Sequence, residues 1–574
     1  MGPNERLSVF VRSELAPNPG RVRAFLRLEV GLVLASFVII TFKPVNGYWT
    51  MVYLLLVSVP TVGNSLLDAV HRTQTSLIGC GVAFLLIIGA YDQAWLFAPL
   101  QAIGLGVALS IARSTPVGPA ALTGGATFAI ITGSDVTQLP ANLVSLGFYR
   151  ILQAVIGSGL GAFVQLVCWP DDPLAALRHS LAVQTEQVAA SLRDEPALPD
   201  ASRVGRHFEL LANAEVRHPG LRRRRSEIGA LILDVACLVD AVVGRRRLPA
   251  PPPSDPLTER LAAAEQRLGS AELFAPPPPP PPAPRAPWRE AMHETTRMAR
   301  RATMKLAASA FIALLISQLC GLPAGGALFV ALAVSMQVSS GTAISKSLLV
   351  VAGLLLALIV VLVIVVPFMP NLDDPGSFLL LAAVAFAPLA WLTIAGPRVR
   401  NAGLFGSVVV AVSLTEDYRP AVDLERPWRF ALTLAIGALV VGAVDRVVWP
   451  VDARRGMVAR AVSMMRDVAA LYREPDPLVI LEPNRRSRWR AHRHLVALVQ
   501  LRSEHLPLPG EARYALEEEV LQIAATTQRL VVARIEEARG ELRGVFAPEA
   551  EADRRAIAAR LEERAAALER NPVS

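Results

Sequence analysis

Residues 157–172 read GSGLGAFVQLVCWPDD, and residues 437–452 read GALVVGAVDRVVWPVD. Each stretch ends a long apolar run at Trp-Pro followed by an aspartate, as a membrane helix does where it reaches water. Gly157 and Gly437 stand at the same distance before this exit. Agreement between such unlike residue types predicts that the chain contains two copies of one unit.

Other positions repeat in the same order. Arg72 precedes Gly79 by the same number of residues as Lys346 precedes Gly353. The polar stretches that follow the two apolar regions match as well, at Gly220, Arg223, Glu227 and Val242 in the first and at Gly510, Arg513, Glu517 and Val532 in the second. The tandem duplication is therefore predicted to include the polar stretches.

The composition indicates a membrane protein. Of the 574 residues, 53% are hydrophobic and 18% are charged, and the mean hydropathy is +0.41. A soluble protein of this length needs more charge to cover its surface. The net charge of +8 comes from arginines that cluster beside apolar runs, as membrane-flanking arginines do, so nucleic acid is not expected as a partner.

A helix that crosses the bilayer needs about 20 mostly apolar residues. The sequence predicts six such segments in each half, at 25–42, 48–62, 73–90, 95–111, 118–133 and 144–169, and at 304–320, 325–339, 347–368, 377–395, 402–415 and 429–449. The segments 48–62 and 325–339 are short for a span. We predict an all-α polytopic fold in five parts: an N-terminal segment (1–24), a first bundle (25–169), a first soluble helical domain (170–303), a second bundle (304–449) and a second soluble helical domain (450–574).

The soluble domains show helical periodicity, for example in 174–193 and 516–542, with arginine and glutamate on one face. Proline runs at 249–253 and 276–282 interrupt the first of them and are typical of stiff polyproline II linkers. These two runs are therefore expected to be exposed and not packed in a core.

Six helices per half return the chain to its starting side, so both soluble domains and both termini share one compartment. Arginine crowds that side, and the positive-inside rule makes it cytoplasmic. An even number of helices also makes the two repeats parallel in the membrane. We expect a transport pathway at the interface between the halves or between protomers of a homo-oligomer.

One stretch of the first half resembles a known family. It runs GYWTMVY at 47–53 and VPTVGNSL at 59–66, followed by Arg72, Thr75-Ser76 and Gly79. The pattern resembles the fusaric acid resistance family, the aromatic acid exporters, and is similar to the plant aluminium-activated malate channels. In place of the family's Gly-Thr pair this chain has Thr75-Ser76.

The second half departs further from the family pattern, since it has Leu349-Val350 at the Gly-Thr position and Leu328 in place of Trp49. The resemblance implies a multi-pass exporter of the bacterial inner membrane, with small and often aromatic carboxylates as substrates and the proton gradient as the driving force. It also implies a periplasmic adaptor protein as a partner, and it adds Trp49 to the candidate substrate site.

Cations at the ends of predicted spans are candidates for binding such an anion. Arg72 and Lys346 begin the third and ninth helices at the cytoplasmic side, where they could gather a carboxylate or serve as interfacial anchors. Arg150 and Arg429 precede the Trp-Pro exits by about 20 residues, the length of a span. Both are therefore expected at the outer face, as anion ligands or as snorkelling side chains.

Acidic residues in or near the spans are candidates for proton coupling. Glu29 lies inside the first apolar run, where a carboxylate is costly and is by default a functional hypothesis. Asp68 and His71 lie beside Arg72, and either could titrate during transport or remain in a solvated turn. Asp445 and Arg446 are neighbours that do not face each other on a helix, so we expect two separate interface anchors.

The sequence contains no sign of enzymatic chemistry. Ser345-Lys346-Ser347 lacks the glycines of a phosphate-binding loop, and the chain has no His-Glu-x-x-His and no convincing nucleophile elbow. Its four cysteines form no Cys-x-x-Cys pair, so neither a metal nor another cofactor is expected. The leading hypothesis is proton-driven efflux of organic anions. The alternatives are a passive anion channel and a membrane scaffold or sensor whose cytoplasmic helices bind partners.

Overall fold

A computed structural model places most of the chain. It describes residues 15–17, 19–58, 65–90, 92–114, 118–133, 139–168, 172–193, 204–245, 256–274, 297–335, 340–372, 374–396, 399–415, 425–448, 453–476, 480, 494–495, 498, 520, 523–528, 530–531, 533–535, 537 and 550–570. The Trp-Pro exits, the turn at 59–64 and both proline runs lie outside these residues.

The chain divides into two compact units. One contains residues 1–170 and 284–450, and the other contains residues 171–283 and 451–574. The apolar helices of both halves therefore fold together, and the two polar stretches fold together in the second unit.

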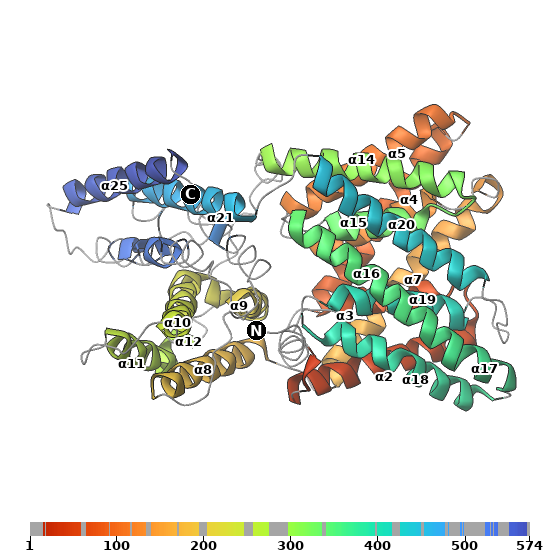
Figure 1. Ribbon diagram of the computed structural model, residues 1–574, viewed down its shortest axis with the longest axis horizontal. Coiled ribbons are helices and arrows are strands. Elements are labelled where there is room, and N and C mark those ends of the chain that lie inside the picture. The colour runs from red at the N-terminus through yellow and green to blue at the C-terminus, as the bar shows by residue number, and fades with distance from the viewer. Residues whose placement is uncertain are drawn as a thin grey trace. The chain divides into compact units, whose positions relative to one another are not determined.

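The first unit contains all the apolar helices, in the order expected from the sequence (Figure 1). Those of the first half are α2 (Pro19–Phe42), α3 (Tyr48–Ser58), α4 (Ser65–Ala90), α5 (Ala94–Ser114), α6 (Gly118–Thr132) and α7 (Leu139–Val167). Those of the second half are α14 (Arg297–Leu319), α15 (Gly325–Ser335), α16 (Ser340–Val360), α18 (Pro375–Ile394), α19 (Arg400–Thr415) and α20 (Glu425–Val447).

The all-α polytopic fold is confirmed. Among the described residues, eight helices are long and apolar enough to cross a membrane, and four apolar helices are shorter. The short ones are α3, α6, α15 and α19, which are the second and fifth helices of each half. An 11-residue helix such as α3 is about 16 Å long, about half of the hydrocarbon thickness.

The short helices form the buried centre of this unit, whereas the long ones face outward. All residues of α19 from Ala402 to Thr415 are buried. The long helices expose large apolar side chains, for example Leu85 and Ile88 of α4, at 73% and 79%. A helix that is apolar all round has to be covered by other helices, and outward apolar side chains suit lipid.

Helix packing in the first unit repeats between the halves. The first helix of each half packs on the fourth helix of the other half, α2 on α18 and α14 on α5. Within each half the third helix packs on the fifth and on the sixth. The duplication seen in the sequence is therefore present in the packing, and the two bundles are joined through equivalent contacts.

Glycines at equivalent positions permit these close contacts. A Cβ on Gly79 would lie 2.1 Å from the carbonyl oxygen of Gly124, and a Cβ on Gly353 would lie 2.2 Å from that of Ala402. Both pairs join the third helix of a half to the fifth. Small residues let membrane helices approach to backbone contact, so these glycines set the spacing of the bundle.

The third helix of the second half is longer than its counterpart. After α16 the chain continues as a π-helical turn, η4 (Val361–Val365), then α17 (Val366–Phe368) and a 3-10 turn, η5 (Met369–Asn371). Pro367 has no N–H to donate to the preceding turn, and such a defect is accommodated by wider turns.

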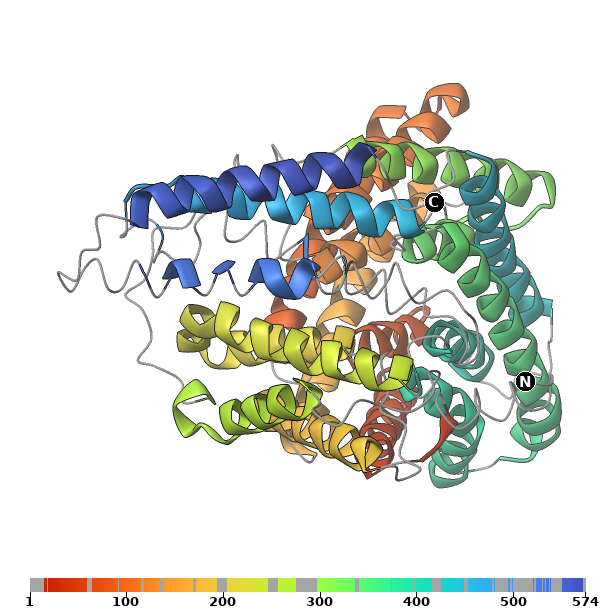
Figure 2. The same ribbon diagram turned by 60° about the vertical axis from the view of Figure 1, so that its left-hand side comes forward.

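The second unit is helical in its described residues. It contains α8 (Pro173–Leu192), α9 (Val204–Arg217), η3 (Pro219–Arg224), α10 (Arg225–Arg245), α11 (Pro256–Gly269), α12 (Ala271–Phe274), α21 (Ala453–Tyr472) and α25 (Ala550–Arg570). Asp172 caps α8 by accepting a hydrogen bond from the Leu174 N–H, and Pro173 occupies the first helical position. α25 lies along α21 (Figure 2).

Candidate functional site

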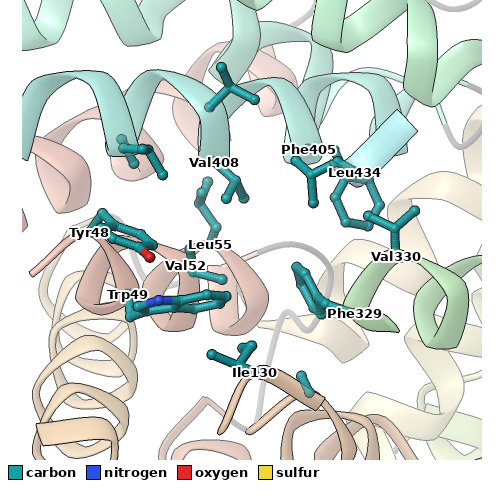
Figure 3. Packing of buried hydrophobic residues seen from close by; sticks show 14 of the residues in the cluster. Tyr48, Trp49, Val52, Leu55, Ile130, Phe329, Val330, Phe405, Val408 and Leu434 are labelled. Carbon is teal, nitrogen blue, oxygen red and sulfur yellow. The ribbon is translucent and has the colours of Figure 1, made fainter. Parts of the chain in front are cut away.

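A cluster of aromatic rings lies in the first unit where helices of the two halves meet (Figure 3). Trp49 of α3 packs edge-on against Phe329 of α15, with ring centroids 6.1 Å apart, and Phe329 packs in the same way on Phe405 of α19 at 5.5 Å. Tyr48 contacts Phe430 of α20 at 6.1 Å. The first half thus supplies the tyrosine and the tryptophan, and the second half supplies the phenylalanines.

The start of α3 is held in place by α7. The turn before α3 has left-handed backbone at Lys43 and Asn46, with φ of 47° and 53°. Gln153 Nε2 donates to the carbonyl oxygens of Val45 and Asn46, at 2.6 and 3.1 Å. These two bonds satisfy carbonyl groups that the left-handed turn leaves without partners in a helix.

The other end of α3 is held in the same way, since Gln165 Nε2 donates to the carbonyl oxygen of Val57 at 3.0 Å. Between these two bonds, a Cβ on Gly157 would lie 2.2 Å from the Thr50 carbonyl oxygen. α7 therefore fixes both ends of α3 and contacts its backbone in the middle.

Arg150 projects from α7 onto the aromatic cluster. Its guanidinium carbon lies 4.6 Å from the centroid of the Trp49 ring, within the range of a cation–π contact. Arg150 is 3% exposed, and its Nη1 donates to Gln153 Oε1 at 3.1 Å. The Tyr48 hydroxyl also lies within interaction range of the guanidinium. The structure therefore brings together two candidates that are 101 residues apart in the sequence, Trp49 and Arg150.

Among the residues that the structure places, no acid balances the charge of Arg150. In the part of the chain that the structure describes, no carboxylate forms an ion pair with Arg150. Arg150 Nε and Trp49 Nε1 are buried donors without a hydrogen-bond acceptor. A buried, unpaired cation is costly, so the site can bind an anion that supplies the missing charge and accepts these donors.

Arg72 is buried as well, at 4% exposure, near the start of α4. Its Nη1 donates to Thr123 Oγ1 of α6 at 2.8 Å. Thr75, one turn later, donates to the carbonyl oxygen of Ala120 at 2.5 Å. An arginine that anchors a helix at the membrane interface would be exposed, whereas Arg72 is buried. Its side chain faces the short helix α6.

A hydrogen-bonded pair of hydroxyls joins α3 to α6. The Tyr53 hydroxyl and Thr127 Oγ1 are 2.8 Å apart, and Thr127 Oγ1 also donates to the carbonyl oxygen of Thr123 at 3.0 Å. Tyr53 interacts with the charge of Arg150. Tyr53 and the two threonines were not among the candidates from the sequence, because a hydroxyl in an apolar run has no charge to mark it.

The second-half candidates are placed differently. Arg429 of α20 is exposed and forms an ion pair with Glu425 at 2.6 Å, one turn earlier on the same helix. The offset of 280 between Gly157 and Gly437 puts Phe430, and not Arg429, opposite Arg150. Lys346 of α16 is half-buried. The structure brings neither cation to the Trp49–Arg150 pair.

The second half also lacks the ring of Trp49. A Cβ on Gly437 would lie 2.2 Å from the Ala327 carbonyl oxygen, the contact that Gly157 makes with Thr50. This equivalence places Gly326 opposite Trp49, where the sequence comparison had placed Leu328. Either alignment leaves the second half without an aromatic side chain at this position.

Of the acidic candidates, Glu29 is the most unusual. It is half-buried on α2, and both of its carboxylate oxygens are buried without a hydrogen-bond partner. His71 is half-buried on α4, and the side chain of Asp68 lies outside the described part of that helix. Among the described side chains of these candidates, Glu29 has the unpaired carboxylate that a membrane proton carrier needs.

One ion pair was missed by the sequence reasoning. Lys305 Nζ of α14 lies 2.7 Å from Asp445 Oδ1 of α20, with side chains 9% and 20% exposed. Asp445 thus pairs with a cation on another helix and not with its neighbour Arg446, as expected for adjacent residues of one helix. Hydropathy alone does not reveal which distant cation faces an acid.

Residues 32–164 match a family described as fusaric acid resistance protein-like. The matched segment extends from α2 into α7 and contains Trp49, Arg72 and Arg150 as well as the Tyr53–Thr127 pair. No curated protein and no solved structure matches the chain. The resemblance inferred from the sequence is thereby confirmed over the first bundle.

Proposed function

We propose, from the membership of residues 32–164 in the fusaric acid resistance protein-like family, that this membrane protein exports small organic carboxylates across the bacterial inner membrane. The observation that carries the proposal is the buried guanidinium of Arg150, which stacks on Trp49 and has no carboxylate partner among the described residues. Aromatic substrates are favoured, because the Trp49 ring that contacts this arginine packs against Phe329 of the second half.

A carboxylate fits the donors of this site. Arginine binds a carboxylate through two parallel N–H groups, and a hydrogen bond to a charged group is stronger than one between neutral groups. Arg150 Nε and Trp49 Nε1 are the buried donors that lack acceptors. A bound carboxylate would accept from both and would neutralise the buried charge.

Transport requires that the aromatic cluster open. Trp49, Phe329 and Phe405 are at most 3% exposed, so the rings close the space between α3, α15 and α19. The cluster is made by both halves, and movement of one half against the other would separate its rings. Alternating access in transporters built from repeats works in this way.

The direction of transport follows from the predicted topology. With both termini in the cytoplasm, Arg72 lies toward the inner mouth and Arg150 toward the outer one, and an adaptor protein would receive the substrate in the periplasm. An inside-negative potential favours anion exit by about 2.3 kcal/mol per charge per 100 mV. Glu29, with its buried unpaired carboxylate, is the proposed proton carrier.

The test uses the purified full chain in liposomes loaded with radiolabelled benzoate. Arg150→Gln is expected to slow benzoate release about ten-fold or more, because losing a hydrogen bond to a charged group costs about 1.5–3 kcal/mol. Arg446→Gln is the matched control, since Arg446 is exposed in the last turn of α20. Equal release by the parent and by Arg150→Gln would contradict the proposal.

A passive anion channel is the second candidate, because an anion leaving a negative interior needs no coupled proton. Glu29→Gln separates the two functions. Coupled export predicts that this variant loses the acceleration that an inward proton gradient gives to the parent. A channel predicts that parent and variant release benzoate at one rate with and without that gradient.

A further inference from the structure

We infer that the carboxylate crosses the membrane through the first half alone. Its route is a row of hydroxyl groups that begins at Arg72 and ends at Arg150. Within this row, the hydroxyls of Tyr53 and Thr127 bind the carboxylate and set the rate at which it crosses. The hydroxyl row comprises Arg72, Thr123, Thr127, Tyr53 and Arg150. The inference rests on the proposed export function and adds to it which half conducts and which uncharged side chains the substrate meets.

Hydrogen bonds connect the members of the hydroxyl row from Arg72 to Tyr53. Arg72 Nη1 donates to Thr123 Oγ1 at 2.8 Å, and the next turn of α6 carries Thr127, whose Oγ1 donates to the Thr123 carbonyl at 3.0 Å. Thr127 Oγ1 meets the Tyr53 hydroxyl at 2.8 Å. Tyr53 lies one turn beyond Trp49 on α3, and the guanidinium carbon of Arg150 lies 4.6 Å from the centroid of the Trp49 ring.

Every member of the row is buried, with exposed fractions between 0% and 4%. Ionisable side chains inside a membrane protein are costly and are by default a functional hypothesis, and this row has such a side chain at each end, Arg72 and Arg150. Ser76 is a further buried hydroxyl, and it lies near the Tyr53 hydroxyl without a hydrogen bond of its own. The space between α3, α4 and α6 therefore holds donors over several helical turns.

The chemistry of the Tyr53–Thr127 pair suits transient binding. When no substrate is present, the Tyr53 hydroxyl can donate to Thr127 Oγ1, whose own hydrogen goes to the Thr123 carbonyl, so both hydroxyl hydrogens are bonded. When a carboxylate arrives, each hydroxyl can turn its hydrogen toward a carboxylate oxygen. The pair thus avoids the cost of an unpaired buried group in either state.

The described positions of the second half that are equivalent to Tyr53 and Arg150 carry apolar side chains. The contact shared by Gly157 and Gly437 places Val330 opposite Tyr53, and Val330 is buried and apolar. Arg150 has Phe430 as its counterpart. The second half therefore provides rings that close the pathway and lacks the matching tyrosine and arginine that would conduct an anion.

The test distinguishes the effect of the Thr127 hydroxyl on transport from the effect of the side chain's volume. Thr127→Val keeps the shape and removes the hydroxyl, whereas Thr127→Ser keeps the hydroxyl and loses a methyl group. The matched control is Thr393→Val: Thr393 of α18 is also fully buried and also donates to its own helix, to Leu389 O at 2.8 Å, but it belongs to the second half. Tyr53→Phe is the second variant that removes a hydroxyl of the pair.

All variants are compared in liposomes by the initial rate of benzoate release at subsaturating benzoate, normalised to inserted protein. Thr127→Val and Tyr53→Phe are expected to be slower than the parent by about ten-fold, the effect of one hydrogen bond to a charged group. Thr127→Ser and Thr393→Val are expected to retain more than half of the parent rate.

Parent-like release by Thr127→Val and Tyr53→Phe, together with slow release by Arg150→Gln, would overturn this inference and leave the proposed function standing. Equal loss in Thr127→Val and Thr127→Ser would also overturn it, because packing and not the hydroxyl would then matter. If Arg150→Gln releases benzoate as fast as the parent, the proposed function fails and the hydroxyl row fails with it.

Discussion

Replacing Gly157 by alanine is expected to force α7 away from α3, to destabilise the first unit and to slow export. The added Cβ would lie 2.2 Å from the Thr50 carbonyl oxygen and 2.9 Å from Tyr53 Cβ. Ordinary contact begins at 3.4 Å, and neither neighbour is the end of a flexible side chain. The two helices must therefore separate by about 1 Å.

The expected cost is the balance of two effects. Adding a methyl group to a well-packed interior costs about 1–3 kcal/mol, and a clash with backbone belongs at the upper end of that range. Alanine regains about 1 kcal/mol of helix propensity over glycine. The net loss of stability is therefore about 1–2 kcal/mol. Because α7 also carries Arg150, the contact of its guanidinium with Trp49 weakens as the helices separate.

Gly159 provides a control on the same helix. A Cβ added there meets nothing within 4 Å, so Gly159→Ala is expected to be as stable as the parent or slightly more stable. Thermal unfolding in detergent and benzoate release from liposomes measure the two effects. Equal midpoints of thermal unfolding for Gly157→Ala and Gly159→Ala would show that the contact between α7 and α3 does not limit stability.

The second-half counterpart completes the comparison. A Cβ on Gly437 would lie 2.2 Å from the Ala327 carbonyl oxygen, so Gly437→Ala is expected to destabilise the chain as much as Gly157→Ala does. Its effect on export is expected to be smaller, because Gly437 does not border the hydroxyl row. Equal export defects in the two variants would argue for conduction by both halves.

Two further predictions concern charges outside the hydroxyl row. Lys305→Met or Asp445→Asn alone is expected to cost about 3–5 kcal/mol by leaving a buried charge unpaired, and the double variant is expected to be more stable than either in the same unfolding assay. In the second unit, burial raises the pKa of Tyr472 to about 12, and its hydroxyl donates to Leu530 O at 2.9 Å. The neutral hydroxyl therefore contributes to the free energy of unfolding in full below the ordinary pKa of 10.0. This contribution is lost as the pH rises toward 12. Tyr472→Phe is expected to be less stable at neutral pH and to lack this alkaline loss, as followed by unfolding between these pH values; an unchanged alkaline transition would show that another group is responsible.

The two halves pack in the same way but differ in the polarity of their interior side chains. Tyr53, Thr127 and Arg150 make the first copy polar inside, whereas Phe430 and Val330 stand at the positions equivalent to Arg150 and Tyr53 in the second. The contacts that hold the bundle together depend on the glycines, and those contacts repeat in both halves. The packing has thus been retained while the interior side chains differ.

The membrane class, the order of the helices, the duplication and the resemblance of the first bundle to a known family could all be predicted from the sequence. These properties depend on the hydropathy of segments about 20 residues long and on local motifs such as the Trp49 helix and the Arg72 turn. A bilayer has one thickness and excludes unpaired backbone groups, so apolar length alone indicates where helices form.

Which polar side chains meet depends on how distant helices pack, and this could not be predicted from the sequence. Trp49 lies under Arg150, Tyr53 reaches Thr127, and Lys305 pairs with Asp445, although each pair is separated by 74 to 140 residues in the chain. The face that one helix presents to another depends on glycine contacts made by distant segments, and such contacts leave no period in the sequence. For the same reason Arg429 and Arg150 looked alike in the sequence, and only packing exposed the first and buried the second.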